Sequence, residues 1–244
     1  MRAAWILAGL AACGRIDFPD LGRTQDAGRD GGGDSSADAT PSSLIHQYSL
    51  DNSYADDLGG PPLNGLGGTL SAGGYAFNNN LGLSVSNAVP ASLYTIDIVF
   101  EFDDVMNYRK LIDFKALGSD AGLYIVNSTL QFVVIPVTGC PGSDCYTSAA
   151  LFANGAVHQV TLARDDVGTV TAFVDRALQF SFSDSGAVGA FDTPGAAANF
   201  FIDDNSTTTE FGSGTVTRIR IYDAALDAGG VPPAAAAPNG GAVQ

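Results

Sequence analysis

Four residues with oxygen-bearing side chains gather late in the chain, where Asp203, Asp204 and Asn205 are consecutive and Glu210 follows shortly after. Carboxylate and amide oxygens are the ligands that Ca²⁺ prefers in proteins. Adjacent carboxylates repel one another unless a cation or water separates them, which gives this stretch a physical reason to bind a cation. The alternative is a solvated acidic turn without metal. The sequence therefore predicts calcium as the candidate cofactor, held by these four residues.

Two cysteines, Cys140 and Cys145, flank a Pro-Gly-Ser-Asp stretch that is typical of a turn. Such a turn brings the two sulfur atoms close together, and disulfides persist in the oxidising compartments that receive exported proteins. We expect a local disulfide here, and closing so small a loop contributes only about 2 kcal/mol to stability. The alternative is a zinc site completed by His46 and His158, but this spacing fits no zinc-finger pattern.

Patterns of nucleophilic and nucleotide chemistry are missing from the sequence. No serine lies in a Gly-x-Ser-x-Gly elbow, and there is neither a Walker A motif nor a dinucleotide fingerprint. We interpret His158, which opens a stretch of strand character, as a packed strand-edge residue rather than a catalyst. The charge balance argues against a nucleic-acid-binding protein. The chain has 11 Lys and Arg residues against 26 Asp and Glu residues, a net charge of −15. Such a chain repels a phosphate backbone, so we expect no nucleic-acid partner.

The first residues have the order of an export signal. Arg2 is followed by an apolar run at residues 3–9 and then by Leu10-Ala11-Ala12-Cys13. This tetrapeptide resembles the lipobox of bacterial lipoproteins, which implies a signal peptide at residues 1–12 and lipidation of Cys13. The resemblance also implies an outer-membrane lipoprotein of the cell envelope. Residues 13–43 are rich in Gly, Asp and Ser and predict a flexible tether, so the lipid is the expected membrane attachment.

The body of the chain alternates bulky and polar residues with a period of two. In YTIDIVFEF, at Tyr94–Phe102, the five bulky residues fall on one face, as in a half-buried strand. Shorter runs of the same character are GLYIV, TLQFVVI, VHQVTLA, TVTAFVD, LQFSF, ANFFID and TVTRIRIYD, separated by turn residues at 165–168, 183–186 and 203–205. The sequence therefore predicts an all-β antiparallel β-sandwich over residues 44–227, followed by an unstructured tail at 228–244.

A family resemblance accompanies this pattern. The segments YTIDIVFEFDDVMNYRKLIDFK, GLYIVNSTLQFV, VHQVTLARDDVGTVTAFVDRALQFSFSD and FFIDDNSTTTEFGSGTVTRIRIYDAALD resemble successive strands of a laminin-G-like, concanavalin A-like jelly roll. The match departs from the family where its usual Asp-Gly turn reads Asp175-Arg176. The resemblance covers most of the chain after the tether and implies a fold much more strongly than a ligand.

Glycosidases of the laminarinase type, which share this fold superfamily, carry Glu-x-Asp-x-x-Glu along one strand. The corresponding stretch here begins at Glu101 and includes Asp103, but Met106 stands at the position of the second glutamate. Retaining hydrolysis needs two carboxyl groups about 5 Å apart, because one must attack while the other donates a proton. The sequence therefore predicts that the chain is not an enzyme.

Sugar binding is the first functional hypothesis, since jelly-roll lectins place aromatic rings against sugars. The single tryptophan, Trp5, would leave with the signal peptide, so tyrosines would have to replace it. The candidates are Tyr75, Tyr108, Tyr124 and Tyr146. We expect a lipid-anchored extracytoplasmic domain that binds a glycan or a protein of the envelope or the extracellular space. A degenerate or atypical glycoside hydrolase and a structural spacer without a dedicated ligand are the alternatives.

Overall fold

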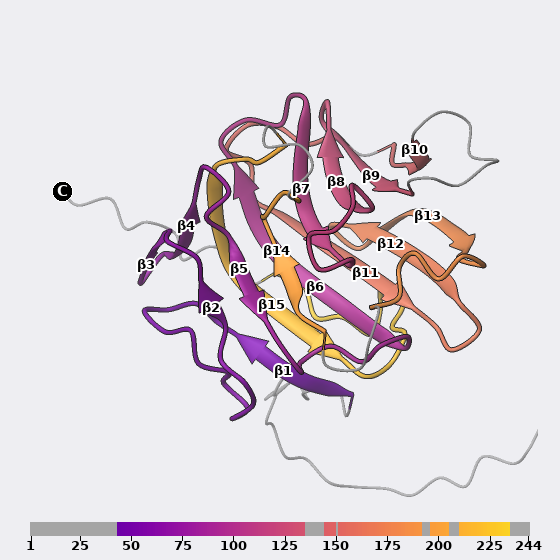
Figure 1. Ribbon diagram of the computed structural model, residues 1–244, viewed down its shortest axis with the longest axis horizontal. Coiled ribbons are helices and arrows are strands. Elements are labelled where there is room, and N and C mark those ends of the chain that lie inside the picture. The colour runs from indigo at the N-terminus through magenta and orange to yellow at the C-terminus, as the bar shows by residue number, and fades with distance from the viewer. Residues whose placement is uncertain (1–42, 135–143, 150, 192–195, 205–209, 235–244) are drawn as a thin grey trace, which may run out of the picture. The chain divides into compact units, whose positions relative to one another are not determined.

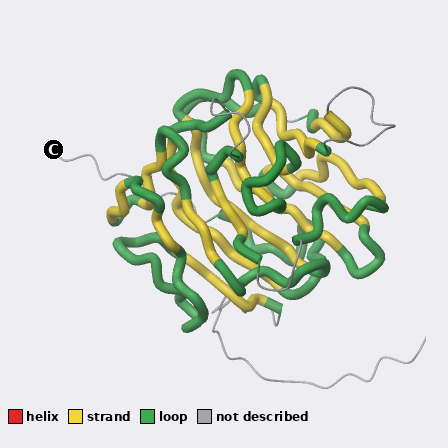
Figure 2. Tube along the Cα trace, in the orientation of Figure 1, coloured by secondary structure: helices red, strands yellow, loops and turns green. Residues whose placement is uncertain are grey.

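Two antiparallel β-sheets packed face to face make up the computed structural model (Figure 1), which describes residues 43–134, 144–149, 151–191, 196–204 and 210–234. Figure 2 shows strands and loops only, and no residue in these ranges is helical. The described part of the chain accordingly contains no helix with the length and apolar character needed to cross a membrane. The predicted all-β antiparallel sandwich is confirmed.

Each sheet has its own strand order. Sheet A runs β13 (Ala177–Ser183), β12 (Thr169–Val174), β11 (His158–Arg164), β6 (Tyr94–Phe102), β15 (Gly214–Tyr222), β4 (Gly74–Phe77) and β3 (Thr69–Ser71), and β1 (Leu44–Tyr48) also pairs with β15. Sheet B runs β10 (Asp144–Thr147), β9 (Thr129–Val133), β8 (Gly122–Val126), β7 (Tyr108–Asp113), β14 (Ala198–Phe200), β5 (Leu83–Val85) and β2 (Asn64–Gly65). Neighbours in these orders are often far apart in the sequence, so the sheets depend on long-range pairing.

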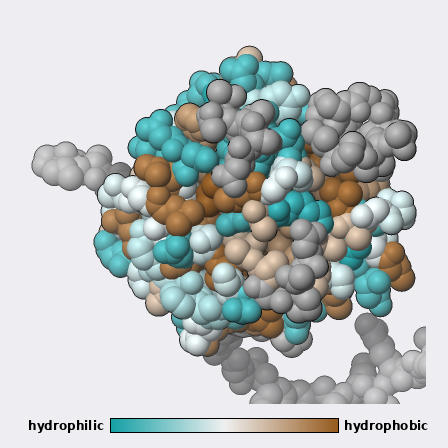
Figure 3. Space-filling view, in the orientation of Figure 1, coloured by the Kyte–Doolittle hydropathy of each residue, from teal (hydrophilic) through white to brown (hydrophobic). Residues whose placement is uncertain are grey.

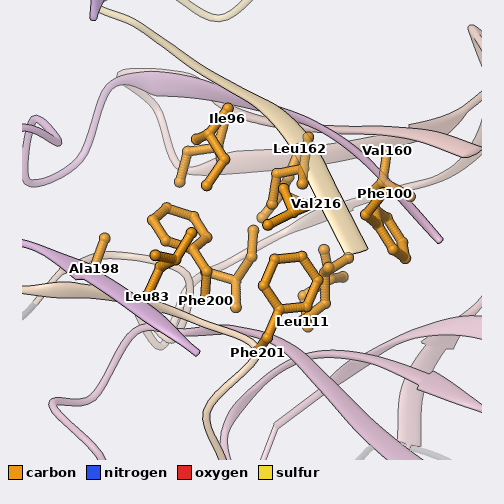
Figure 4. Packing of buried hydrophobic residues seen from close by; sticks show 14 of the residues in the cluster. Leu83, Ile96, Phe100, Leu111, Val160, Leu162, Ala198, Phe200, Phe201 and Val216 are labelled. Carbon is orange, nitrogen blue, oxygen red and sulfur yellow. The ribbon is translucent and has the colours of Figure 1, made fainter. Parts of the chain in front are cut away.

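The core lies between the sheets and is built by the period-two pattern of the strands. The five bulky residues of β6 all belong to it, as the sequence predicts, while Thr95 and Asp97 lie on the opposite face of sheet A. Figure 4 shows Ile96 and Leu162 of sheet A facing Leu83 and Phe200 of sheet B. Each fully buried side chain of this size contributes about 1.5–3 kcal/mol, so this layer is the main stabilising feature.

Tight turns connect the strands of sheet A where the sequence predicts them. The Asp165 carboxylate accepts hydrogen bonds from the backbone N–H groups of Val167 and Thr169, and Gly168 takes a φ of 87°. In the next hairpin Asp175 and Arg176 have φ values of 48° and 68°. Two successive positive φ values are the signature of a type I′ turn, so Asp-Arg does here what Asp-Gly does in the family pattern.

The strand predicted over residues 198–203 ends earlier, at Phe200. Phe201 adopts a φ of 59°, a left-handed conformation that a bulky residue rarely takes and that breaks the strand. Its ring is nevertheless 1% exposed and belongs to the core. The turn at Phe201 therefore ends the strand pairing while the side chain remains anchored between the sheets.

A C-terminal segment, residues 224–234, crosses the outer face of sheet A. Thr95 Oγ1 on β6 donates a hydrogen bond to the Ala224 carbonyl, at 2.6 Å. Gln159 on β11 donates to the Pro232 carbonyl and accepts from the Ala234 N–H, at 2.9 and 2.8 Å. Val231 is 1% exposed. The packed chain thus extends beyond the boundary predicted at residue 227.

Candidate functional site

The four candidate tyrosines do not form one aromatic platform. Tyr75 lies in the core with 0% exposure, and its hydroxyl accepts a hydrogen bond from the Gly68 N–H and donates to a carbonyl oxygen of the Leu81-Gly82 pair. Its ring face is therefore not available to a sugar. The side chain of Tyr146 lies outside the described part of the structure, although its backbone belongs to β10.

Tyr108 and Tyr124 do meet, on the outer face of sheet B. Their rings pack edge to face, with centroids 6.1 Å apart and an interplanar angle of 89°. They share a small apolar cluster with Val126 and Val133. Tyr124 is 1% exposed and Tyr108 is partly buried, so Tyr108 alone of this pair keeps an exposed portion.

Next to this pair lies a buried ionic cluster around Lys110, a residue that the sequence analysis missed. Lys110 Nζ donates a 2.6 Å hydrogen bond to the Tyr124 hydroxyl and lies 3.7 Å from a carboxylate oxygen of Asp113 and of Asp204. The side chains of the lysine and both aspartates are 0% exposed. A buried charge is tolerated only when it is paired, so this ammonium and these carboxylates depend on one another.

The described calcium candidates, Asp203, Asp204 and Glu210, lie at this cluster. The Asp203 carboxylate accepts hydrogen bonds from the backbone N–H groups of Asp204 and Glu210, at 2.9 and 3.0 Å. Asn205 lies outside the described residues. Across the described ranges, no three His, Cys, Asp or Glu side chains are grouped so as to hold a metal ion. Calcium stays a prediction, and a rise in melting temperature at millimolar Ca²⁺ would support it.

Glu210 gives the cluster a pH dependence. Burial, followed by the negative charges of Asp203 and Asp120, raises the pKa of Glu210 to about 7. Because the folded state then holds a proton that the unfolded state releases, we expect the free energy of unfolding to fall as pH rises from about 4.5 to 7. Urea unfolding followed by circular dichroism across this range measures the slope. Glu210→Gln should flatten it, and an unchanged slope in that variant would contradict the assignment.

A surface pocket of about 250 Å³ opens at the rim beside this cluster, and we call it the rim pocket. It is lined by Asn78, Asn79, Asp104, Arg109, Phe211, Gly212 and Ser213. Six of these residues come from three connections, those between β4 and β5, between β6 and β7, and before β15, and Arg109 lies on β7. Figure 3 shows that the upper rim, where the β6–β7 connection lies in Figure 1, is largely hydrophilic.

An internal network fixes the wall of the rim pocket. Arg109 Nη2 donates to Asp104 Oδ2 at 2.7 Å, and Arg109 Nη1 donates to the Phe211 carbonyl at 3.2 Å. Hydrogen bonds from the Met106 N–H and then from Arg109 hold the pKa of Asp104 below its usual value, so this carboxylate is ionised. A Cβ at Gly212 would lie 2.7 Å from the Phe102 ring, which leaves room for glycine alone. The pocket is therefore pre-formed.

Each histidine is paired with an aspartate. His158 begins β11, and its Nδ1 lies 2.8 Å from Asp175 Oδ2, a polar contact at the strand edge. His46 Nδ1 lies 2.6 Å from Asp56 Oδ2. Of the predicted cysteine sites, Cys13, Cys140 and the side chain of Cys145 fall outside the described residues, so lipidation and the disulfide stay predictions.

Comparisons with known proteins find likeness in structure. The sequence matches no protein-family profile. It also matches no curated protein sequence. Domain 4 of AbnA, a GH43 extracellular arabinanase from Geobacillus stearothermophilus solved with arabinotriose, aligns over 77% of this chain and 96% of its own, with 15% identity and a TM-score of 0.55. Trypanosoma rangeli sialidase aligns over 79% of this chain and 32% of its own, with 17% identity and a TM-score of 0.59.

A third similar structure is the binding domain of botulinum neurotoxin serotype D, which aligns over 77% of this chain and 50% of its own, with 14% identity and a TM-score of 0.52. The chain thus spans nearly all of the arabinanase domain, half of the toxin domain and about a third of the sialidase.

Glycoside hydrolases recur among these structures, and this contradicts the prediction that the chain is not an enzyme. That prediction depended on Met106, at the end of a motif that requires two glutamates on one strand. In the structure β6 ends at Phe102, and Met106 is 51% exposed on the loop beyond it. Because Met106 lies beyond the end of β6, its identity does not decide whether two carboxyl groups form a catalytic pair elsewhere in the domain. At these low identities the structural likeness establishes a shared fold, the antiparallel β-sandwich.

Proposed function

We propose that the chain binds a glycan in the rim pocket. The observation that carries this proposal is the pocket itself, where an ionised carboxylate, two carboxamides and a phenyl ring surround a pre-formed hollow. Ligand sites typically combine apolar contact area with a few fixed polar groups. Sugars match this chemistry because they present hydroxyls on their edges and C–H groups on their faces.

The polar groups of the rim pocket suit hydroxyl groups in particular. Asp104 can accept hydrogen bonds only, whereas the carboxamides of Asn78 and Asn79 both donate and accept. A sugar hydroxyl also does both, so neighbouring hydroxyls can bridge a carboxylate and an amide. Phe211 is partly exposed and offers an apolar edge to the C–H groups of the ring.

Charge and size narrow the class of glycan. Asp104 contributes a fixed negative charge, its partner Arg109 is already engaged by Asp104 and by backbone carbonyls, and the whole chain carries −15. An acidic sugar would meet repulsion here, so a neutral sugar is favoured. The volume of about 250 Å³ falls below the roughly 300 Å³ of common ligand pockets, which suits the end of a chain rather than a long stretch.

The comparisons support the same class of ligand. The arabinanase domain, which this chain matches along nearly its whole length, was solved with arabinotriose, a neutral oligosaccharide. Structures of the sialidase include one with sialic acid, an acidic sugar. These two ligands form a matched pair of probes, one neutral and one acidic.

Isothermal titration of the full chain with arabinotriose and with sialic acid tests the proposal. Binding of arabinotriose should weaken about 10- to 100-fold in Asp104→Ala, because a hydrogen bond to a charged group contributes about 1.5–3 kcal/mol. Asn79→Ala should weaken it by about fivefold. Asn64→Ala, an exposed asparagine on β2 outside the pocket, serves as the control.

Two results would overturn the proposal. One is the absence of binding to arabinotriose and to a panel of other neutral oligosaccharides. The other is binding that Asp104→Ala leaves unchanged. Chromatography of the same mixtures detects cleavage products, and cleavage would assign the pocket to glycoside hydrolysis as well as to binding.

We also propose that a lipid on Cys13 holds the domain at the cell envelope. The support is the order of a charged residue, a short apolar run and Leu10-Ala11-Ala12-Cys13, ahead of a tether-like stretch. Expression of Cys13→Ala in a bacterial host should leave an unprocessed precursor that does not partition into detergent. Identical processing and partitioning of the variant and the parent chain would refute lipid attachment.

A further inference from the structure

A second pocket, of about 400 Å³, opens where the chain approaches β6 from β5. It is lined by Ile45, His46, Asn87, Ala88, Val89, Pro90 and Ala91. Its walls are therefore apolar except for the His46 imidazole and the Asn87 carboxamide. We call it the β1 pocket, because the first two residues belong to β1.

The β1 pocket is independent of the rim pocket. Residues 87–91 precede β6, whereas Asp104 of the rim pocket follows it, so the two pockets lie at opposite ends of this strand. A nine-residue strand is roughly 30 Å long. A ligand in one pocket therefore makes no contact with the other.

One wall of the β1 pocket holds an imidazole in a fixed orientation. His46 Nδ1 lies 2.6 Å from Asp56 Oδ2, and the Asp56 side chain is 0% exposed. Asp56 also accepts hydrogen bonds from three backbone N–H groups, those of Gln47, Leu58 and Gly60. A buried carboxylate with four donors around it has no freedom to rotate, so it fixes the ring that it binds.

The same contacts decide which nitrogen carries the proton. Burial by itself raises the pKa of Asp56, but the hydrogen bonds from His46 and from the backbone outweigh it and hold this pKa below its usual value. The ionised carboxylate can only accept, so His46 Nδ1 must be the donor. With Nδ1 as the donor, the neutral tautomer of the ring carries its lone pair on Nε2.

The chain packs tightly around the His46–Asp56 pair and around the opposite wall of the β1 pocket. A Cβ at Gly60 would lie 2.3 Å from Asp56 Oδ2 and 2.5 Å from His46 Nδ1, so the chain closes tightly over the pair. On the other wall the Phe191 N–H donates to the Ala91 carbonyl at 2.9 Å, and Pro90 restricts the backbone. Both walls are thus held in place without a ligand.

We propose that the β1 pocket binds a small, largely apolar alcohol or phenol whose hydroxyl donates a hydrogen bond to His46 Nε2. The apolar walls supply contact area for the body of the molecule, and the volume of about 400 Å³ lies within the range of small-molecule sites. The lone pair on Nε2 favours a ligand that carries a hydrogen-bond donor. A ligand without a donor would displace water from this nitrogen and leave it without a hydrogen bond. An ammonium ion is disfavoured, since the walls offer no anion to replace its water.

Benzyl alcohol and toluene are the probes, because they share a shape and differ in the hydroxyl. Each is titrated into the ¹⁵N-labelled full chain, and amide shifts at Ala88 and Ala91 report binding. Toluene should bind about fivefold more weakly than benzyl alcohol.

Two variants separate the hydrogen bond from the pocket. His46→Asn keeps an N–H donor near Asp56 and removes the Nε2 acceptor, so benzyl alcohol should bind about fivefold more weakly while toluene is unaffected. Ala91→Leu fills the pocket and should weaken both probes at least tenfold. Val167→Ala, on a distant exposed turn, should change neither.

The proposal is overturned if benzyl alcohol shifts neither amide. Equal binding of the two probes, or wild-type binding by His46→Asn, would show that the hydroxyl plays no part. None of these outcomes bears on the rim pocket, whose ligand is measured separately.

Discussion

Replacing Lys110 with methionine should lower the free energy of unfolding by about 3–5 kcal/mol, because it removes the cation from a buried cluster. The Lys110 ammonium lies 3.7 Å from carboxylate oxygens of Asp113 and Asp204, and all three side chains are 0% exposed. Methionine keeps most of the volume, so the loss comes from removing the positive charge beside two buried carboxylates. Urea unfolding followed by far-ultraviolet circular dichroism measures the change.

Two further variants test this explanation. Arg176→Met removes a positive charge from an exposed turn and should cost less than about 1 kcal/mol. Adding Asp204→Asn to Lys110→Met should recover part of the lost stability, because it removes one of the two buried negative charges beside residue 110. A small effect of Lys110→Met, or no recovery in the double variant, would mean that water or a cation reaches the carboxylates.

Truncating Phe201 to alanine should also cost about 3–5 kcal/mol, the usual range for a buried phenylalanine. The Phe201 ring stacks on Phe77, with centroids 4.1 Å apart and an interplanar angle of 17°, and it contacts Phe100 and Phe102. Leaving this space empty forfeits the contacts with these three rings of sheet A. The same unfolding experiment measures the loss.

The backbone at Phe201 supplies an unusual internal control. Its φ of 59° strains any residue with a Cβ, and glycine relieves that strain. We therefore expect Phe201→Gly to be more stable than Phe201→Ala by about 1 kcal/mol, whereas glycine is normally the worse choice inside a folded element. The usual order, with alanine above glycine, would show that the left-handed turn does not persist without the ring.

The strands were readable from the sequence because their signal is local. Residues 94–102 alternate so regularly that five side chains had to share one face, and the structure places those five in the core. The turn at Asp165 was readable for the same reason, since the carboxylate caps its own neighbours. The end of β14 could not be predicted from the sequence, because residues 198–203 continue the apolar pattern through the left-handed Phe201.

The sites were harder to predict because they assemble residues from distant segments. Lys110 lies in a strand of ordinary composition, and no nearby sequence pattern predicts that Asp204 and Tyr124 contact it. The acidic stretch around Asp203 did carry a signal, and the structure brings it to this cluster. Neither pocket could be predicted, since each one combines separate segments of the chain whose meeting depends on the order of strands in the two sheets.

One feature of sheet A governs when the domain can fold. β15 is the last strand in the described part of the chain, yet it lies inside the sheet, between β6 on one side and β4 and β1 on the other. Until residues 214–222 leave the ribosome, β6 lacks one neighbour and β1 has no partner strand. Closing such long loops is slow, so the nascent domain should stay incompletely folded until residues 214–222 have emerged.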